Sequence, residues 1–259
     1  LQYEEYIVEQ LVKNNGFVQR TNLDFDRFYA LDRGLLFEFL ENTQSNIVTR
    51  LKKIYKADYQ EIIIGKLNAD IVSKSLIYVL KHGISIGNET LHFMFTKPAT
   101  DFNKTANENY QKNIFSVAKE VYARDEERID LVLFLNGIAI ISFELKCNAA
   151  GQSFENAIYQ FRNDRDPKSR LFLYKAGCLV NFAMDLEEVY MTTKLDKEKT
   201  HFFPFNKGNG EGIHSGKGNP LNDDGFGVSY MWDEVLKKDS LLEIISKFII
   251  QLIWILEHT

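Results

Sequence analysis

Residues 128–147 read RIDLVLFLNGIAIISFELKC, two apolar runs separated by an Asn-Gly pair at positions 136–137. An Asn-Gly pair between runs rich in β-branched and aromatic residues predicts a β-hairpin with a two-residue turn. Asp130, Glu144 and Lys146 interrupt the apolar pattern. Because core strands seldom carry unpaired charges, these three side chains are the first candidates for a functional site.

The three charged residues should meet at the end of the hairpin that lies away from the turn. Side chains alternate along a strand, so Glu144 and Lys146 share one face of the second strand, and Asp130 can lie on the same face of the first. Antiparallel pairing about the turn then brings all three within cross-strand reach.

Two neighbouring carboxylates repel each other, and one lysine offsets that repulsion only in part. A divalent cation would compensate them, because Asp130, Glu144 and the backbone carbonyl of Leu145 form the hard-oxygen shell that Mg²⁺ prefers, with Mn²⁺ as an alternative ion. Such an ion polarises a phosphoryl oxygen and activates a bound water, while Lys146 places that water or stabilises the developing charge. This pattern indicates phosphodiester hydrolysis, and a plain Asp130–Lys146 ion pair at a wet hairpin end is the alternative.

The patterns outside this hairpin predict an α/β fold with a helical part near the N-terminus. Helices are expected at residues 3–15, 32–44 and 45–58. A hairpin at 83–96 should form one small sheet with a strand at 113–123 and with the 128–147 pair. A helix at 152–164 ends before Pro167, and two further strands follow at 177–185 and 188–195.

Glu4 is a further candidate, because it falls on the apolar stripe of the first expected helix. A glutamate in the first turn also complements the helix dipole, which is the structural alternative for this residue.

The C-terminal part of the chain changes character at residue 207. Seven glycines among the 21 residues at 207–227 predict a flexible loop or linker. It divides a domain at 1–206 from a helical segment at 228–259, in which residues 239–240 cap an apolar helix at 241–256. That helix is apolar nearly all round, so we expect other protein surface to cover it.

Composition excludes several classes of protein. The 36 acidic and 31 basic residues give a formal net charge of -5, which is unlike a dedicated tight binder of nucleic acid but compatible with a nuclease whose carboxylates hold a cation. The longest apolar run, at 248–256, is about half of the ~20 residues that a membrane span needs. Two cysteines without metal-ligand spacing, and no secretory signal, favour a reduced, cytoplasmic protein.

The order of motifs also resembles a known family. A helix with an inward glutamate precedes a strand with Asp130, a strand with Glu144-x-Lys146 and a helix within GQSFENAIYQFRNDRDP at 151–167. This order and these sequences resemble the N-terminal nuclease domain of the restriction (R) subunit of type I restriction-modification enzymes. The similarity extends from EEYIVEQLVKNNGF at 4–17 to SLLEIISKFI at 240–249. The resemblance implies a restriction-endonuclease-like core of the PD-(D/E)xK type, with a central mixed β-sheet flanked by helices and a helical insertion near the N-terminus.

The resemblance assigns roles to individual residues. Asp130 matches the metal-binding acid, Glu144 the second acid and Lys146 the lysine of the nuclease triad. Glu4 matches the glutamate of the first helix, with Glu5 as the alternative. Gln160 matches the glutamine of a Gln-x-x-x-Tyr motif, although Asp164 stands where the tyrosine is expected. The nearest basic stretch could contact phosphates without reading bases, or be an ordinary solvated face, and consists of Arg162, Arg165, Lys168 and Arg170.

The function implied is Mg²⁺-dependent endonucleolytic cleavage of double-stranded DNA. The implied partners are that DNA and the modification and specificity subunits of a type I complex, with ATP serving only the full-length enzyme through a motor beyond residue 259. Two alternatives stay open. One is a non-catalytic DNA-binding or subunit-docking module with the same fold, and the other is a nuclease of another PD-(D/E)xK branch.

Overall fold

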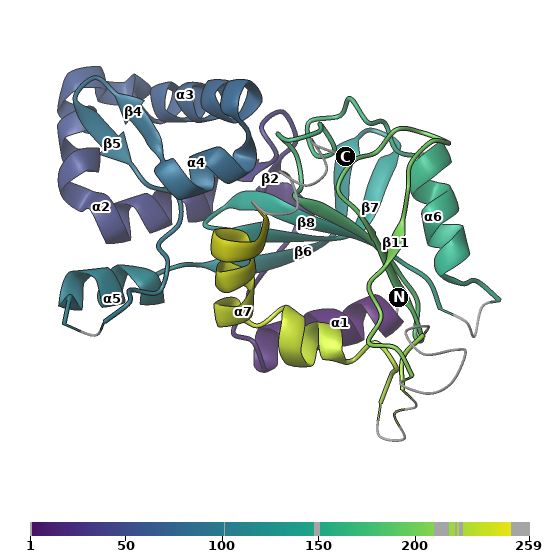
Figure 1. Cartoon of the computed structure of the whole chain (residues 1–259). Helices are drawn as coiled ribbons and strands as arrows, with labels where there is room; N and C mark the ends of the chain where they lie inside the picture. The colour runs from purple at the N-terminus through teal and green to yellow at the C-terminus, as the bar shows by residue number, and fades with distance from the viewer. Residues whose placement is uncertain are drawn as a thin grey trace.

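A mixed sheet of nine strands forms the centre of the molecule (Figure 1). The structure is a computed structural model that describes residues 2–100, 102–147, 151–209, 218–220, 222 and 225–249. The main path of the sheet is β1-β6-β7-β8-β9-β10-β11, and β2 and β3 attach beside β8. Pairing is parallel between β1 and β6 and between β8 and β9, and antiparallel elsewhere. The strands are β1 (Val18–Arg20), β2 (Phe25–Asp26), β3 (Leu31–Asp32), β6 (Phe115–Arg124), β7 (Glu127–Leu135), β8 (Ile138–Leu145), β9 (Val180–Met184), β10 (Val189–Thr192) and β11 (Phe203–Pro204).

The β7–β8 hairpin is present as the sequence predicts. Asn136 and Gly137 have φ values of 51° and 80°, the two positive values that a tight two-residue turn of this kind requires. The Asn136 side chain is fully buried, where it accepts a hydrogen bond from the Ile114 N–H and donates one to the Phe93 carbonyl. The turn is therefore fixed both by its own backbone and by two neighbouring segments.

A side chain at Gly137, in the turn of this hairpin, should disrupt the fold. A Cβ at Gly137 would lie 2.4 Å from the Asp32 carbonyl oxygen and 2.6 Å from the Leu36 nitrogen. We expect Gly137→Ala to lower the free energy of unfolding by roughly 2–5 kcal/mol, because a left-handed backbone and an overlap with main-chain atoms both add cost. Gly87→Ala is the matched control, since Gly87 has φ +60° and no atom within 4 Å of the added Cβ. Equal denaturation midpoints for the two variants would contradict the expectation.

A helical lobe is inserted between β3 and β6 and lies at the left of Figure 1. Its elements are α2 (Arg33–Tyr55), η2 (Lys56–Asp58), α3 (Tyr59–Lys74), α4 (Leu76–His82), β4 (Ile84–Ile86), β5 (Glu89–Leu91) and α5 (Lys104–Gln111). The helices predicted at 32–44 and 45–58 are one helix, α2, with a break at Gln44, where φ is -138°. The Gln44 side-chain amide donates a hydrogen bond to the His92 carbonyl and accepts one from the His92 N–H.

The hairpin predicted at 83–96 exists as β4 and β5, but its place in the sheet was wrong. β4 and β5 form a separate two-stranded sheet, whereas the strand predicted at 113–123 is β6 of the central sheet. The contact between Gln44 and His92 ties this hairpin to α2, so it belongs to the helical lobe.

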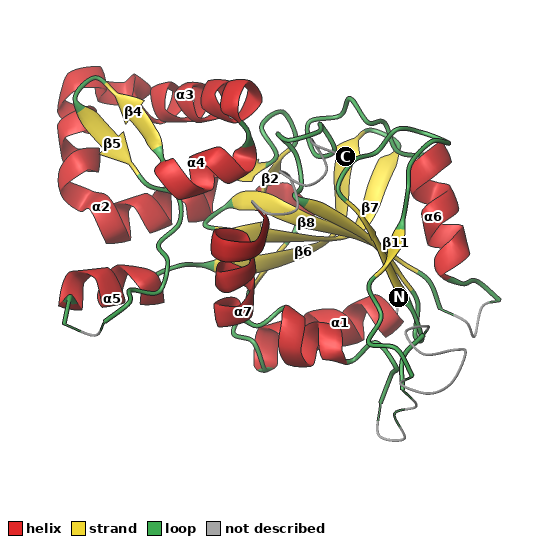
Figure 2. Ribbon diagram, in the orientation of Figure 1, coloured by secondary structure: helices red, strands yellow, loops and turns green. Residues whose placement is uncertain are grey.

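Helices cover both faces of the central sheet (Figure 2). One face carries α1 (Gln2–Lys13) and α7 (Lys238–Glu243), and the buried side of α1 presents Tyr3, Ile7, Val8 and Leu11 to the larger apolar core. The other face carries α6 (Phe154–Asn163), which buries Ala157 and Phe161 against a smaller core. The result is an α/β fold with a mixed sheet between helices, as predicted.

The segment after residue 225 packs into the same core as α1. Phe226, at the end of the predicted linker, makes edge contacts with Tyr3, Tyr6 and Trp232. The helix predicted at 241–256 begins earlier, at Lys238, and continues as the wider turn η6 (Ile244–Phe248). The predicted cap at 239–240 was wrong, because Asp239 lies inside the first turn and accepts a hydrogen bond from the Tyr110 hydroxyl.

Parts of the predicted linker and of the last helix, residues 210–217, 221, 223–224 and 250–256, lie outside the described residues. Among the helices that are described, none is both long and apolar enough to cross a membrane.

Candidate active site

Asp130, Glu144 and Lys146 lie together at the end of the β7–β8 hairpin that is remote from the turn. Leu131 of β7 pairs with Phe143 of β8, so the next position brings Asp130 beside Glu144. Lys146 follows β8 directly, and its Nζ lies 3.9 Å from Asp130 Oδ2. The structure therefore gathers the three residues that the sequence analysis placed together.

Asp130 is held in place by the strand opposite. Its Oδ2 accepts a hydrogen bond of 2.7 Å from the Leu145 N–H, and the residue is only 6% exposed. The Asp130 side chain therefore has a fixed position next to the end of β8, with Lys146 as its ion-pair partner.

Glu144 is fully buried and has two oxygens in different situations. Its Oε1 accepts a hydrogen bond of 2.7 Å from Arg165 Nε. Its Oε2 is buried without a hydrogen-bond partner among the described residues. Burial and then the charge of Asp130 raise the pKa of Glu144 to about 8, against the opposing effects of Arg165 and Lys146. An unsatisfied buried carboxylate oxygen is costly, and at a candidate site it calls for a ligand.

The two glutamates of α1 differ in their surroundings. Glu4 is half-buried, and burial followed by the negative charge of Asp130 raises its pKa. Glu5 is exposed and forms an ion pair with Lys119. Glu4 is therefore coupled electrostatically to Asp130 of the candidate site. Within the described ranges, no group of three or more His, Cys, Asp and Glu side chains could hold a metal, so Glu4 does not join Asp130 and Glu144 in a three-carboxylate cluster.

Gln160 points a second unsatisfied oxygen into the protein. It lies on α6, which begins with a capping box formed by Ser153 and Asn156. Gln160 Oε1 is buried and has no hydrogen-bond partner among the residues that the structure describes. Asp164, at the position where the family motif has tyrosine, is the exposed C-cap residue of the helix.

The four basic residues expected to contact phosphate do not share one exposed face. Arg165 is 3% exposed, and its guanidinium binds Glu144 Oε1 and the Arg128 carbonyl, so it is not available to DNA in this arrangement. Arg170 donates to the Asn68 side chain and the Ala176 carbonyl. Lys168 is the exposed member of the set. These placements correct the expectation of a joint phosphate-contacting stretch.

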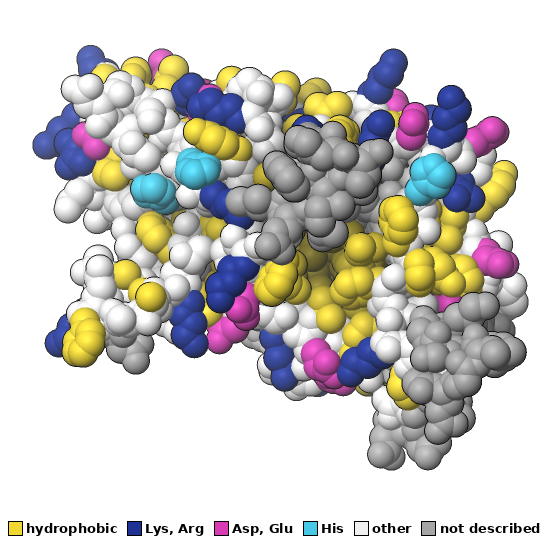
Figure 3. Space-filling model, viewed as in Figure 1, with side chains coloured by type: hydrophobic (Ala, Val, Ile, Leu, Met, Phe, Trp, Pro, Cys, Tyr) yellow, Lys and Arg dark blue, Asp and Glu magenta, His cyan; other side chains and the backbone are white. Residues whose placement is uncertain are grey.

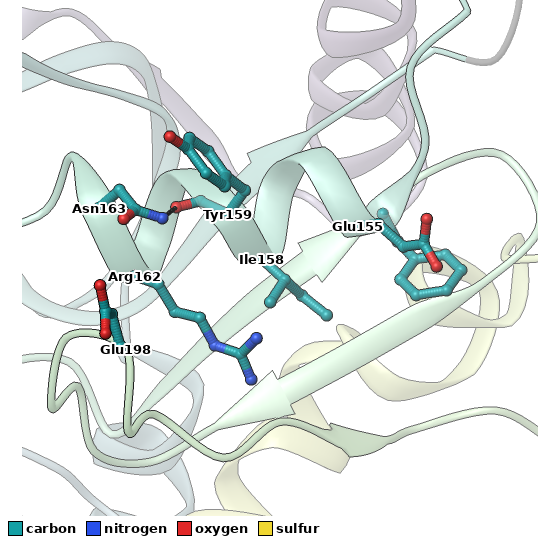
Figure 4. A pocket seen from close by; sticks show the side chains of 7 residues that line it. Glu155, Ile158, Tyr159, Arg162, Asn163 and Glu198 are labelled. Carbon is teal, nitrogen blue, oxygen red and sulfur yellow. Dashed lines mark hydrogen bonds between the residues drawn. The ribbon is translucent and has the colours of Figure 1, made fainter.

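Arg162 lies in an open depression on the outer side of α6, with a volume of about 630 Å³ (Figure 4). Its guanidinium donates to the Thr200 carbonyl and lies over the Phe202 ring. The other lining residues are Phe154, Glu155, Ile158, Tyr159, Asn163 and Glu198.

The contact between Arg165 and Glu144 is the part of the site that sequence reasoning missed. The two residues are 21 positions apart, and Arg165 lies in the loop after α6. Strand and helix periodicity carry no signal for a loop residue that turns inward, so the composition of the stretch led to the opposite expectation.

Comparison with known proteins identifies the family of the chain. No curated protein matches the chain. A family model, described as type I restriction enzyme R protein N terminus, matches residues 3–200, which include every candidate site residue named above. Since this match covers most of the 259 residues, the chain belongs to the family of type I restriction enzyme R protein N-terminal domains.

Proposed function

We propose that this chain is the nuclease domain of a type I restriction enzyme R subunit, which cleaves double-stranded DNA endonucleolytically with Mg²⁺, or Mn²⁺, as cofactor. Family membership supports a nuclease role. The observation that carries the proposal is the pairing of two carboxylates at adjacent strand ends, one of which keeps a buried oxygen without a hydrogen-bond partner among the described residues.

The donor set suits a hard divalent cation. Asp130 and Glu144 supply carboxylate oxygens, and Leu145 supplies a backbone carbonyl between Glu144 and Lys146. Mg²⁺ is commonly held by one or two carboxylates together with water and substrate oxygens, so two acids suffice. Glu144 Oε2 is the atom most in need of such a ligand, because it is buried and unsatisfied.

The protein residues would divide the chemistry among them. A bound ion would supply Lewis-acid polarisation of a phosphoryl oxygen and a water of lowered pKa. The Lys146 ammonium, anchored 3.9 Å from Asp130, would stabilise the negative charge that develops on the phosphate. Gln160 carries an amide whose oxygen is unsatisfied, which suits it to orient water or the scissile strand from α6.

The remaining assignments follow from the proposed role in the assembly. The partners would be double-stranded DNA and the modification and specificity subunits of the type I complex in the cytoplasm. ATP would be used by the motor of the full-length enzyme and not by this domain.

The test is cleavage of a plasmid by the reconstituted type I complex with and without divalent metal. We expect nicking and double-strand cleavage in Mg²⁺ or Mn²⁺, and none in excess EDTA. The rival function, a non-catalytic docking or DNA-binding module, predicts DNA association without metal-dependent cleavage in the complex.

Binding by the isolated chain should be weak and insensitive to sequence. The formal net charge is -5, and on the face drawn in Figure 3 basic side chains are interspersed with acidic ones and do not form a stripe. We therefore expect affinities in the range of roughly 10⁻⁴–10⁻⁶ M at physiological salt, falling as salt rises, because phosphate contacts release counterions. A gel-shift titration with one duplex and its scrambled version measures both properties. Tight binding to one of the two duplexes only would refute this expectation.

A further inference from the structure

Arg165 occupies an unusual place for an arginine in a domain that handles DNA. Its side chain is 4% exposed and makes a buried ion pair with Glu144. The loop that carries it is anchored on several sides. Lys197 Nζ donates to the Arg165 carbonyl at 2.8 Å, the Asp166 N–H donates to Glu127 at 2.5 Å, and the Asp166 carboxylate pairs with Arg124. Such a buried and anchored arginine acts on its protein neighbours and not on a ligand at the surface.

The guanidinium divides its hydrogen bonds between two partners. Nε binds Glu144 Oε1 at 2.7 Å, and one terminal nitrogen binds the Arg128 carbonyl of β7 at 2.8 Å. Arginine and carboxylate often pair through two parallel hydrogen bonds, which would use both carboxylate oxygens. Here one terminal nitrogen binds the Arg128 carbonyl instead, and Glu144 Oε2 has no hydrogen-bond partner among the residues that the structure describes.

Glu144 itself lies where the proposed chemistry needs a ligand. Glu144 stands beside Asp130 at the ends of β8 and β7. The hydrogen bond from Arg165 restricts the orientations that the Glu144 carboxylate can adopt. Groups that orient a metal ligand in this way commonly determine metal affinity as strongly as some ligands do.

We infer that Arg165 is a positioning residue that holds one oxygen of Glu144 so that the other faces the metal site beside Asp130. This inference rests on the proposed metal-dependent nuclease function. It goes beyond that function in naming a residue that acts through Glu144 and touches neither the ion nor the DNA. It also replaces the expectation that Arg165 contacts phosphate.

Calorimetric titration of Mn²⁺ into the 259-residue chain, without DNA, tests the inference. Removal of a group that orients a metal ligand typically weakens affinity by about 10–100-fold, and we expect a loss of that size for Arg165→Ala. Arg165→Lys keeps the charge but cannot bind Glu144 and the Arg128 carbonyl in the same geometry as the guanidinium. Its Mn²⁺ affinity should therefore fall between those of the wild type and Arg165→Ala. Tighter binding by Arg165→Ala would show that the guanidinium competes with the ion, which would overturn the inference.

A double variant separates action through Glu144 from action by another route. Glu144→Gln should itself weaken binding, and adding Arg165→Ala to it should cause no further loss, because the residue to be positioned has already lost its ligand character. A further loss in the double variant would contradict the inference. The double variant also removes both members of the buried ion pair, so it avoids leaving one charge buried alone.

Arg20→Ala is the matched control for lost stability. Arg20 pairs with Asp32, a carboxylate that is 1% exposed, at 2.6 Å. Asp32 lies at the turn end of the β7–β8 hairpin, where its N–H donates to the Gly137 carbonyl, and so at the opposite end from the triad. Arg20→Ala should lower the melting temperature as Arg165→Ala does, but leave Mn²⁺ affinity unchanged. An equal loss of affinity in both variants would reduce the effect to general destabilisation and overturn the inference.

The failure of each proposal gives a different result. If the wild-type chain binds Mn²⁺ and Arg165→Ala binds it equally well, the positioning role is wrong and the proposed function stands. If the wild type binds no Mn²⁺, both are wrong. DNA titrations in EDTA complete the test, because Arg165→Ala should keep wild-type affinity and salt dependence, whereas a reduced salt slope would return Arg165 to the role of phosphate contact.

Discussion

Asp130→Ala, Glu144→Ala and Lys146→Ala should each abolish DNA cleavage by the reconstituted complex while ATP hydrolysis continues. The two carboxylates are the proposed ligands of the ion, so a chain that lacks either should cut below the detection limit. Lys146 acts by charge stabilisation, and loss of one such group typically costs about 100–1000-fold. ATP hydrolysis should continue because the triad lies at the end of one hairpin in this domain, and the proposed motor is a separate part of the full-length enzyme.

Plasmid nicking and phosphate release, measured on the same preparations, check this expectation. Lys52→Ala is a matched surface control, since Lys52 pairs with Glu41 in the helical lobe. The complex with this variant should cut DNA at the wild-type rate. Wild-type cleavage by any one triad variant would remove that residue from the mechanism. Loss of both cleavage and ATP hydrolysis would indicate misfolding or failed assembly and would contradict the separation of the two activities.

The gathering of the three residues at one hairpin end was predictable, because they lie on two strands joined by a tight turn. The Asn-Gly pair fixes the turn, and counting from it alone would place Asp130 opposite Phe143. A register shift between Leu133 and Phe134 moves the pairing by one residue and brings Asp130 beside Glu144, which the alternation of side chains does not predict. The boundary between the predicted helices at 32–44 and 45–58 coincides with the kink at Gln44, although α2 continues through it.

The errors arose where contacts between distant segments decide the structure. The hairpin β4–β5 joins the helical lobe because Gln44 binds the His92 backbone across 48 positions. Arg165 turns inward because Glu144, 21 positions earlier, offers a buried charge. The β4–β5 segment has ordinary strand propensity, and the stretch around Arg165 has an ordinary basic composition. Propensity and composition alone therefore predict the wrong contacts for both segments.

Stability at neutral and alkaline pH should depend on metal, because Glu144 has a raised pKa of about 8 in the folded protein without metal. The folded state then holds this proton more tightly than the unfolded chain, whose glutamate has its ordinary pKa of about 4.3. The contribution of this group is fully present below the unfolded value and is lost as pH rises through about 8. We expect the melting temperature in EDTA to fall between pH 5 and pH 8, and the stabilisation by Mg²⁺ to grow over the same interval, since the ion binds the ionised carboxylate.

The largest stability effect should come from the metal itself and should disappear in Asp130→Asn. A cation that binds only the folded state adds about 2.7 kcal/mol at one hundred times its dissociation constant. For a chain of this length that corresponds to a rise in melting temperature of roughly 5–10 °C. In EDTA above about pH 8, where Glu144 is ionised, Asp130→Asn should melt above the wild type, because the amide removes the repulsion with Glu144 while its oxygen can still accept the 2.7 Å hydrogen bond from Leu145.

Asp70→Asn gives the opposite result in EDTA and so serves as the control. Asp70 is also buried, but it pairs with Lys66 and Lys74, and loss of its charge should lower the melting temperature while the full metal shift is kept. Melts of wild type, Asp130→Asn and Asp70→Asn, with EDTA and across a millimolar Mg²⁺ titration, measure all of these effects. Asp130 lies beside the Glu144 carboxylate as well as Lys146, whereas Asp70 lies beside two lysines, so opposite signs in EDTA would identify repulsion at the triad as the cause. If Asp130→Asn keeps the wild-type metal shift, Asp130 is not a ligand, and the charged end of this hairpin is an ion pair with Lys146 that serves the fold.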